Sequence, residues 1–317
     1  SYLQGLIHYY WNDLDGATRH FDKAVSDRYV LHTAAALESL VGLALTYQAL
    51  EQPDSVDATV ALLLEYVQAT NNPAYMTVAR SCQARLSLMQ GDLESAVHWL
   101  EMVELAPNPG VMFYWLEIPH ITQCRILIAQ GSEASLDEAG TKLAVYEKTN
   151  RAENNTRQLI DVLLLQSLNY QKQSLSDQAL ATLTGAIALA ELGGFIRPFL
   201  DLGPKMADQL VRLSQSGVAP AYIARILAAF PEQKMDEKRL EGAYGADTSF
   251  VESLTPRELD VLALLAQGLT NKDIAQQLVI SHGTVRQHVY NLFQKHQVNN
   301  RLQAVAKATD LGIQFPE

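Results

Sequence analysis

Apolar residues recur at intervals of three and four positions up to about residue 240, in long segments rich in Ala, Leu, Gln and Glu. This spacing puts apolar side chains on one face of a helix, whereas the period of two that is typical of strands is nearly absent. The pattern therefore predicts an all-α protein.

A finer pattern repeats within these segments: a helix ends near a polar turn, and the next helix carries a small residue followed by a large one four positions later. The copies are Gly5, Ala17, Phe21 and Ala24; Ala96, Leu100 and Val103; Ala139 and Leu143; and Ala179, Leu183 and Ala186. Small residues let paired helices approach closely, and large residues fill the groove between them. The spacing resembles tetratricopeptide repeats and predicts a superhelical array with one poorly marked repeat between Ala17 and Ala96. A generic helical bundle is the alternative.

A different pattern begins after residues 233–250, which lack an apolar period and are typical of a linker. Thr255, Pro256 and Glu258 are arranged like a helix start. The apolar stripe of this helix is predicted at Leu259, Leu262, Ala263 and Leu265 or Ala266, with its end at Gly268. We therefore predict a helical-repeat domain over residues 1–240, a linker over 241–253 and a small four-helix domain over 254–317.

Two further helices are predicted in this small domain. A short one covers residues 271–278, with Ile274, Ala275 and Leu278 facing inward. Val279 and Ile280 form the turn, and Ser281 caps a third helix that starts at His282. The inward stripe of that third helix is Val285, Val289, Leu292 and Phe293, and its opposite face carries Gly283, Arg286, Gln287, Tyr290 and Gln294. This order is that of a helix-turn-helix motif, whose second helix reads DNA bases.

The charge distribution supports a nucleic-acid partner for this domain. No Asp or Glu occurs in residues 274–309, a run of 36 positions in which the average for the whole chain would give about four. Residues 1–250 hold 18 Lys+Arg and 29 Asp+Glu, whereas residues 251–317 hold 6 of each, so the net charge of -11 belongs to the part of the chain before the small domain. Because phosphates repel carboxylates and attract Arg, Lys and amide donors, we predict that the third helix lies in the major groove of double-stranded DNA.

The motifs of this region resemble the LuxR-type DNA-binding domain. The resemblance covers about 60 residues and includes Leu-Thr-x-Arg-Glu at 254–258 and Gly-Leu-Thr-Asn-Lys-Asp-Ile-Ala at 268–275. It continues through Ser281, Thr284, Val285, Arg286, His288, Lys295, Val298, Arg301 and Ala304. Two positions depart from the family pattern: His296 stands where Leu is common, and Tyr290 is not one of the usual basic residues.

The resemblance implies a role for individual residues of the domain. Arg286, Gln287 and Tyr290 are expected to face the bases. Contacts to phosphate and sugar are expected from Asn271, Lys272, Ser281, Thr284, His288 and Lys295. The fourth helix, about residues 301–311, is expected to form a homodimer contact on DNA. The function implied is that of a bacterial transcriptional regulator.

The upstream part resembles the large ATP-binding LuxR regulators of the maltose-activator type, which carry a nucleotide-binding domain, then helical repeats, then the DNA reader. The resemblance rests on the helical repeats followed by "GGFIRPFLDLG" before the DNA-binding domain. No Gly-x-x-x-x-Gly-Lys-[Ser/Thr] occurs in this chain. Either a nucleotide-binding domain has been left off or it is absent naturally, and a start at Ser1 without Met favours a chain cut from a longer polypeptide.

Other chemistry finds little support in the sequence. His282, His288 and His296 share no helical face with a carboxylate or thiolate, so they do not predict a metal site, and the common hydrolase motifs are absent. We therefore predict neither an enzyme nor a cofactor. The apolar runs are too short to cross a bilayer. Cys82 and Cys124 are expected to be buried free thiols, which fits a reducing cytoplasm.

The repeats leave a second function class open. Helical arrays present extended surfaces, so a small-molecule or protein effector is expected on residues 1–240. The aromatic groups Tyr9, Tyr10 and Trp11, and Phe113, Tyr114 and Trp115, could line such a site, although aromatic residues in repeats are more often core. The alternative to a DNA-binding regulator is a protein-interaction scaffold whose helix-turn-helix is a docking module.

Overall fold

The computed structural model describes residues 1–105, 115–230, 256–267, 269–278, 284–285 and 288–289. All regular secondary structure in these residues is helical, which confirms the predicted all-α class. The chain separates into two compact units, Ser1–Tyr244 and Gly245–Glu317. Among the helices of the described ranges, none combines the length and the apolar character needed to span a membrane.

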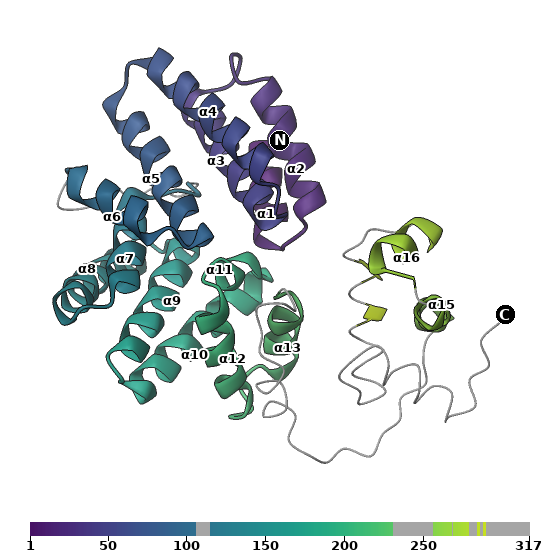
Figure 1. Cartoon of the computed structure of the whole chain (residues 1–317). Coiled ribbons are helices and arrows are strands. Elements are labelled where there is room, and N and C mark those ends of the chain that lie inside the picture. The colour runs from purple at the N-terminus through teal and green to yellow at the C-terminus, as the bar shows by residue number, and fades with distance from the viewer. Residues whose placement is uncertain (106–114, 231–255, 268, 279–283, 286–287, 290–317) are drawn as a thin grey trace. The chain divides into compact units, whose positions relative to one another are not determined.

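Ten helices of the first unit form five successive hairpins (Figure 1). Their bounds are α1 (Tyr2–Tyr10) with α2 (Leu14–Ser26), α3 (Thr33–Ala49) with α4 (Pro53–Thr70), α5 (Pro73–Gln90) with α6 (Leu93–Met102), α7 (Pro119–Gln130) with α8 (Glu133–Ala152), and α9 (Thr156–Lys172) with α10 (Ser176–Gly193). The first helix of each hairpin also packs on the first helix of the next. This stacking confirms the predicted helical-repeat array, because each hairpin covers a face that its neighbour could not bury alone.

Three shorter helices follow the hairpins. They are α11 (Arg197–Leu200), α12 (Pro204–Ser214) and α13 (Pro220–Ala228). The first of them contacts α9 and also α1 at the opposite end of the array. The backbone N–H of Ile196 donates to the carbonyl of Tyr10 at 2.7 Å, so the chain returns to its first helix after nearly two hundred residues.

The predicted small and large positions are the contacts between helices. Ala17, Ala96, Ala139 and Ala179 are all buried. Phe21 is fully buried, and a Cβ added at Gly5 would lie 2.6 Å from its ring, which explains why glycine stands there. The poorly marked repeat is the α3–α4 hairpin. There Thr59 and Leu63 take the small and large positions and are buried.

The turns between helices follow from local sequence. Asp13, Asp92, Ser132 and Asn155 each accept a hydrogen bond from a backbone N–H in the first turn of the following helix. Side-chain acceptors of this kind satisfy N–H groups that have no partner inside the helix. In the predicted polar turn before α6, Gly91 ends α5 with φ of 89°, a left-handed conformation that glycine adopts without steric cost.

The C-terminal unit contains α15 (Pro256–Ala266) and α16 (Asn271–Leu278), and residues 284–285 and 288–289 are also helical. Pro256 opens α15, and the bounds of α16 agree with the prediction. The buried cluster consists of Val261, Leu264, Leu265, Ile274, Ala275, Val285 and Val289, with Leu269 and Leu278 packed against it. The prediction for the inner faces of α16 and the third helix is confirmed where those residues are described.

The predicted stripe on α15 needs correction. Val261 and Leu264 belong to the buried cluster, although the prediction omitted them, whereas Ala263 and Ala266 are only half-buried. Leu262 is buried as predicted. The buried face of α15 is therefore wider than one apolar stripe, because α16 and the third helix pack on the same helix.

Candidate DNA interface and a buried polar cluster

Four of the nine residues predicted to contact DNA are described. Lys272 and Thr284 are exposed, whereas Asn271 and His288 are half-buried. The other five, Ser281, Arg286, Gln287, Tyr290 and Lys295, lie outside the described residues, as do Leu292 and Phe293 of the inner stripe and residues 301–311 of the predicted dimer helix.

The first turn of α16 is held by a reciprocal cap. The backbone N–H of Asp273 donates to Thr270 Oγ1 at 3.3 Å. In return, Thr270 donates to Asp273 Oδ2 from its hydroxyl at 2.6 Å and from its backbone N–H at 3.1 Å. These bonds, led by the one from the hydroxyl, lower the pKa of the exposed Asp273 carboxyl. The cap fixes where α16 begins, and thereby positions Asn271 and Lys272 in its first turn.

The structure shows which side of the third helix is buried. Val285 is fully buried and Val289 is buried in the same cluster, at a spacing of four residues. Thr284, next to Val285, is exposed. The inner stripe predicted from the sequence is therefore confirmed at both of its described positions, and these two valines fix the rotation of the helix about its axis at this point.

A second polar region lies inside the helical array and was not predicted from the sequence. Arg85 of α5 contacts Glu117 at 3.3 Å and Asp201 at 2.9 Å, and all three side chains are almost entirely buried. Asp201 also pairs with Arg197 at 2.6 Å and accepts a hydrogen bond from the Tyr9 hydroxyl at 2.7 Å. Burial opposes ionisation of Asp201, but Arg197 and Arg85 together hold the pKa of this carboxyl below its ordinary value. It is therefore an ionised carboxylate at neutral pH.

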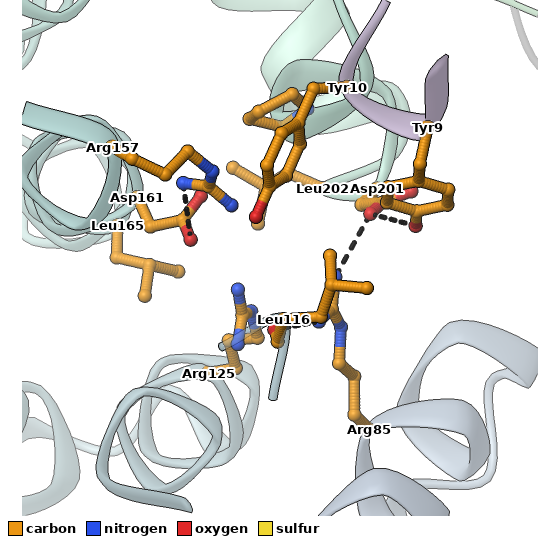
Figure 2. Close-up of a pocket in the computed structure, with 11 residues that line it drawn as sticks. Tyr9, Tyr10, Arg85, Leu116, Arg125, Arg157, Asp161, Leu165, Asp201 and Leu202 are labelled. Carbon is orange, nitrogen blue, oxygen red and sulfur yellow. Dashed lines mark hydrogen bonds and ion pairs between the residues drawn. The ribbon is translucent and has the colours of Figure 1, made fainter. Parts of the chain in front are cut away.

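A neighbouring group of polar residues joins the same cluster. Arg157 pairs with Asp161 at 2.8 Å and lies 4.0 Å over the ring centre of Tyr10. Arg125 of α7 extends toward the same space (Figure 2). Glu38 is buried and has no ion pair in the part of the chain that the structure describes, and burial raises the pKa of its carboxyl to about 8. Glu38 is therefore mostly protonated at neutral pH, whereas its neighbour Glu117 is paired with an arginine.

The aromatic residues divide between core and surface. Tyr9 and Tyr10 are buried, so the interpretation as core is confirmed for them. Trp11 is 52% exposed, although its ring N–H donates to the carbonyl of Gly193 at 2.9 Å. Trp115 is half-buried, and Phe113 and Tyr114 lie outside the described residues. Cys82 and Cys124 are buried free thiols, as predicted.

One local signal could have indicated this cluster. The cluster contains two pairs of opposite charge whose members are four residues apart, Arg157 with Asp161 and Arg197 with Asp201. This spacing places the two members of a pair on the same helix face. Such pairs are usually solvent-exposed, so the sequence offered no reason to place them in the interior. The partners contributed by Arg85 and Tyr9 come from distant helices and have no local signal.

Comparison with known proteins identifies both units. Residues 2–216 match the family described as "MalT-like TPR region", and residues 252–308 match "Bacterial regulatory proteins, luxR family". The chain is 31% identical over 246 residues to the "HTH-type transcriptional regulator MalT" of Serratia proteamaculans (strain 568) and 30% identical over 243 residues to the protein of the same name from Yersinia enterocolitica.

These alignments cover 70% of this chain but only 26% of each relative, so the chain spans about a quarter of the length of the curated relatives it matches. The family match to the helical array nevertheless covers more than half of the chain. The chain therefore belongs to the family with a MalT-like TPR region and carries, after that region, a domain of the luxR family of bacterial regulatory proteins.

Proposed function

We propose that this chain is the signal-receiving and DNA-binding part of a bacterial transcriptional regulator, in which the helix that contains Val285 and Val289 enters the major groove of double-stranded DNA. The observation that carries the proposal is the match of residues 252–308 to the luxR family of regulatory proteins, behind a MalT-like helical array. Two relatives that align with the chain over 246 and 243 residues are named as transcriptional regulators.

The described valines support the assignment of the base-reading residues. A helix advances about 100° per residue, so if one helix runs through these positions, the buried Val285 and Val289 lead us to expect position 287 on the side away from them and positions 284 and 290 next to it. Arg286 is expected at the boundary between the inner and outer sides. We therefore propose that Arg286, Gln287 and Tyr290 contact bases, and that Thr284 and His288 contact the backbone beside them.

Charge supports the same surface. The run of 36 residues without a carboxylate, 274–309, covers the whole of the proposed reading helix. Lys272 is exposed in the first turn of α16, where a cation at the N-terminus of a helix favours a phosphate. We further propose that Asn271, Ser281 and Lys295 contact the DNA backbone, and that two copies bind paired half-sites through residues 301–311.

The function that we propose for each domain follows the two family matches. Residues 1–240 receive an effector or protein signal, residues 241–253 link the domains and residues 254–317 bind DNA. The array is strongly acidic, so it is not expected to bind DNA itself. We also propose that the chain has no enzymatic activity of its own and acts in the cytoplasm.

The test begins with selection of binding sites from random duplexes by the intact chain, which gives the half-sites and their spacing. Gel-shift titration on the selected site then compares the chain with Arg286→Ala, which should weaken specific binding by roughly 1 to 3 kcal/mol, the usual value for one good base contact. Arg212→Ala, at an exposed position of α12, removes the same charge from the array and should change affinity little. Equal affinity of Arg286→Ala and the unmodified chain would contradict the assignment.

Salt dependence separates DNA binding from a docking function. Binding through phosphate contacts releases counterions, so affinity should fall steeply and linearly on a logarithmic scale as salt concentration rises. A flat response, or no enriched site in the selection, would favour the protein-interaction scaffold.

A further inference from the structure

A small cavity lies in the helical array, where side chains of α1, α5, α7, α9 and α11 converge (Figure 2). Its volume is about 10 Å³, which is room for about one water-sized occupant. Tyr10, Arg85, Arg125 and Arg157 line it together with Asp161 and Asp201. Three of the six are arginines, although the residues up to 250, which include this unit, carry the entire net negative charge of the chain.

The charges around this cavity do not balance. Three carboxylates lie near the cavity, and each is paired with an arginine. Glu117 pairs with Arg85, Asp161 with Arg157, and Asp201 with both Arg85 and Arg197. Arg125 is the fourth cation of the group. Within the described residues it has no carboxylate inside ion-pair distance, and its polar contact is a hydrogen bond from Nη1 to Thr122 Oγ1 at 3.3 Å.

Nearby Glu38 does not supply the missing negative charge. Its carboxyl oxygen Oε2 accepts the backbone N–H of Leu116 at 2.5 Å, and its other oxygen, Oε1, is buried without a hydrogen-bond donor in the described part of the chain. Burial raises the pKa of this carboxyl to about 8, so it is mostly neutral at pH 7. The neutral Glu38 leaves one guanidinium in excess.

An excess cation in a partly enclosed site is costly, because a guanidinium taken out of water needs a compensating charge or a full set of acceptors. Enclosure and, after it, the charge of Arg85 lower the pKa of Arg125, as expected for a cation without a counter-ion. Arg125 is half-buried and borders the cavity, so an occupant of the cavity would lie beside it.

We propose that this cavity is a binding site for a small anion, with Arg125 as its counter-charge and Arg157 and the Tyr10 hydroxyl as neighbouring donors. The volume admits one acceptor atom, which is a halide ion or one oxygen of a carboxylate group. Inorganic phosphate is too large for it. The site is independent of the proposed DNA binding, since all of its residues belong to the helical array.

The position of the cavity gives occupancy a structural consequence. It adjoins the contact between the two ends of the array, where Tyr9 bonds to Asp201 at 2.7 Å and Arg197 Nη1 donates to Asn12 Oδ1 at 3.0 Å. An anion held between Arg125 of α7 and Arg157 of α9, next to Tyr10 of α1, links this contact to the middle of the array. Anion binding should therefore stabilise the closed arrangement of the first unit.

The test is thermal unfolding of the full chain followed by tryptophan fluorescence, which reports on the array alone because Trp11, Trp99 and Trp115 all lie in it. Sodium phosphate is replaced stepwise by sodium bromide or sodium formate at constant ionic strength. A ligand that binds only the folded state raises the midpoint, here by roughly 2 °C or more at saturation. A rise with bromide identifies a halide site and a rise with formate alone a carboxylate site, and either result supports the proposal.

Two variants make the test specific. Arg125→Met should lose the response to both anions, and in phosphate alone it should be at least as stable as the unmodified chain, because it removes an uncompensated charge. Arg80→Met, at an exposed position of α5, should respond like the unmodified chain. A purely structural Arg125 predicts the opposite for Arg125→Met in phosphate, namely a clear loss of stability.

Bromide soaked into crystals of the unmodified chain gives a second readout that needs no variant. An anomalous peak beside Arg125 is expected for a halide site, and for a carboxylate site formate should appear there in electron density. The proposal is overturned if the midpoint rises equally in Arg125→Met and the unmodified chain. It is equally overturned if neither anion raises the midpoint and neither appears in the cavity.

Discussion

In the helical array, polar side chains from residues 192 positions apart, Tyr9 and Asp201, meet in the interior. In the C-terminal unit, by contrast, Thr270 and Asp273, which bond to each other through their side chains, are only three positions apart. The buried cluster of that unit is made of aliphatic side chains from three short segments. The array depends on charged contacts between its two ends, whereas the C-terminal unit depends on local caps and an apolar centre. The two units should therefore respond differently to loss of a polar group.

The largest effect is expected at the carboxylate that joins the ends of the array. Asp201→Asn leaves Arg85 and Arg197 without their shared counter-charge, and removal of one partner from a buried ion pair typically costs about 3 to 5 kcal/mol. Urea unfolding followed by tryptophan fluorescence measures the free energy of unfolding. Glu101→Gln, at an exposed position of α6, is the matched control and should change it by less than about 0.5 kcal/mol. A similarly small loss for Asp201→Asn would show that these ion pairs do not hold the array closed.

The second prediction concerns Glu38 and pH. Its pKa is about 8 in the folded protein and about 4.5 in the unfolded chain, so between these values the folded state binds the extra proton and stability falls as pH rises. Glu38→Gln keeps the shape of the side chain without the ionisation. The free energy of unfolding of Glu38→Gln, relative to that of the unmodified chain, should increase by roughly 1 kcal/mol for each pH unit between 5 and 8. A difference that does not change across this range would contradict the assignment of a protonated Glu38.

The third prediction tests the packing of the repeats without involving charge. A Cβ at Gly42 would collide with the ring of Phe21, so Gly42→Ala should destabilise the array by about 1 to 3 kcal/mol despite the higher helix propensity of Ala. At Gly185 of α10 a Cβ meets nothing within 4 Å, and Gly185→Ala should be neutral or slightly stabilising. Equal midpoints in urea for the two variants would mean that the α2–α3 contact has room to adjust.

The smallest effect is expected in the C-terminal unit. Thr270→Ala removes the cap of α16, which is typically worth about 1 kcal/mol, or roughly a fivefold increase in amide hydrogen exchange of that helix. Gln276→Ala, at an exposed position of the same helix, should leave exchange almost unchanged. Exchange in the array should be unaffected by both. Faster exchange of array amides in Thr270→Ala would show that the two units are coupled.

Much of the architecture was predictable because its causes are local. Apolar spacing of three and four gave the helices, and small residues at Ala17, Ala96, Ala139 and Ala179 marked where they approach closely. The bounds of α16 and the inner positions Val285 and Val289 were predictable for the same reason. The repeat predicted between Ala17 and Ala96 could not be assigned to Thr59 and Leu63, because a hydroxyl residue occupies the small position. Val261 and Leu264 were missed because the width of a buried face depends on how many helices pack on it.

The sequence by itself determined an all-helical chain, the repeat in its first part, the carboxylate-free segment in its second and the family of each part. Only the tertiary structure decided that Arg85, Glu117, Asp201 and Tyr9 form one buried cluster and that Arg125 is left without a carboxylate partner among the described residues. Helix periodicity acts over three to seven residues, so it can be read from the chain. The meeting of α1 with α11 depends on the accumulated curvature of all the hairpins between them, which no short stretch of sequence specifies.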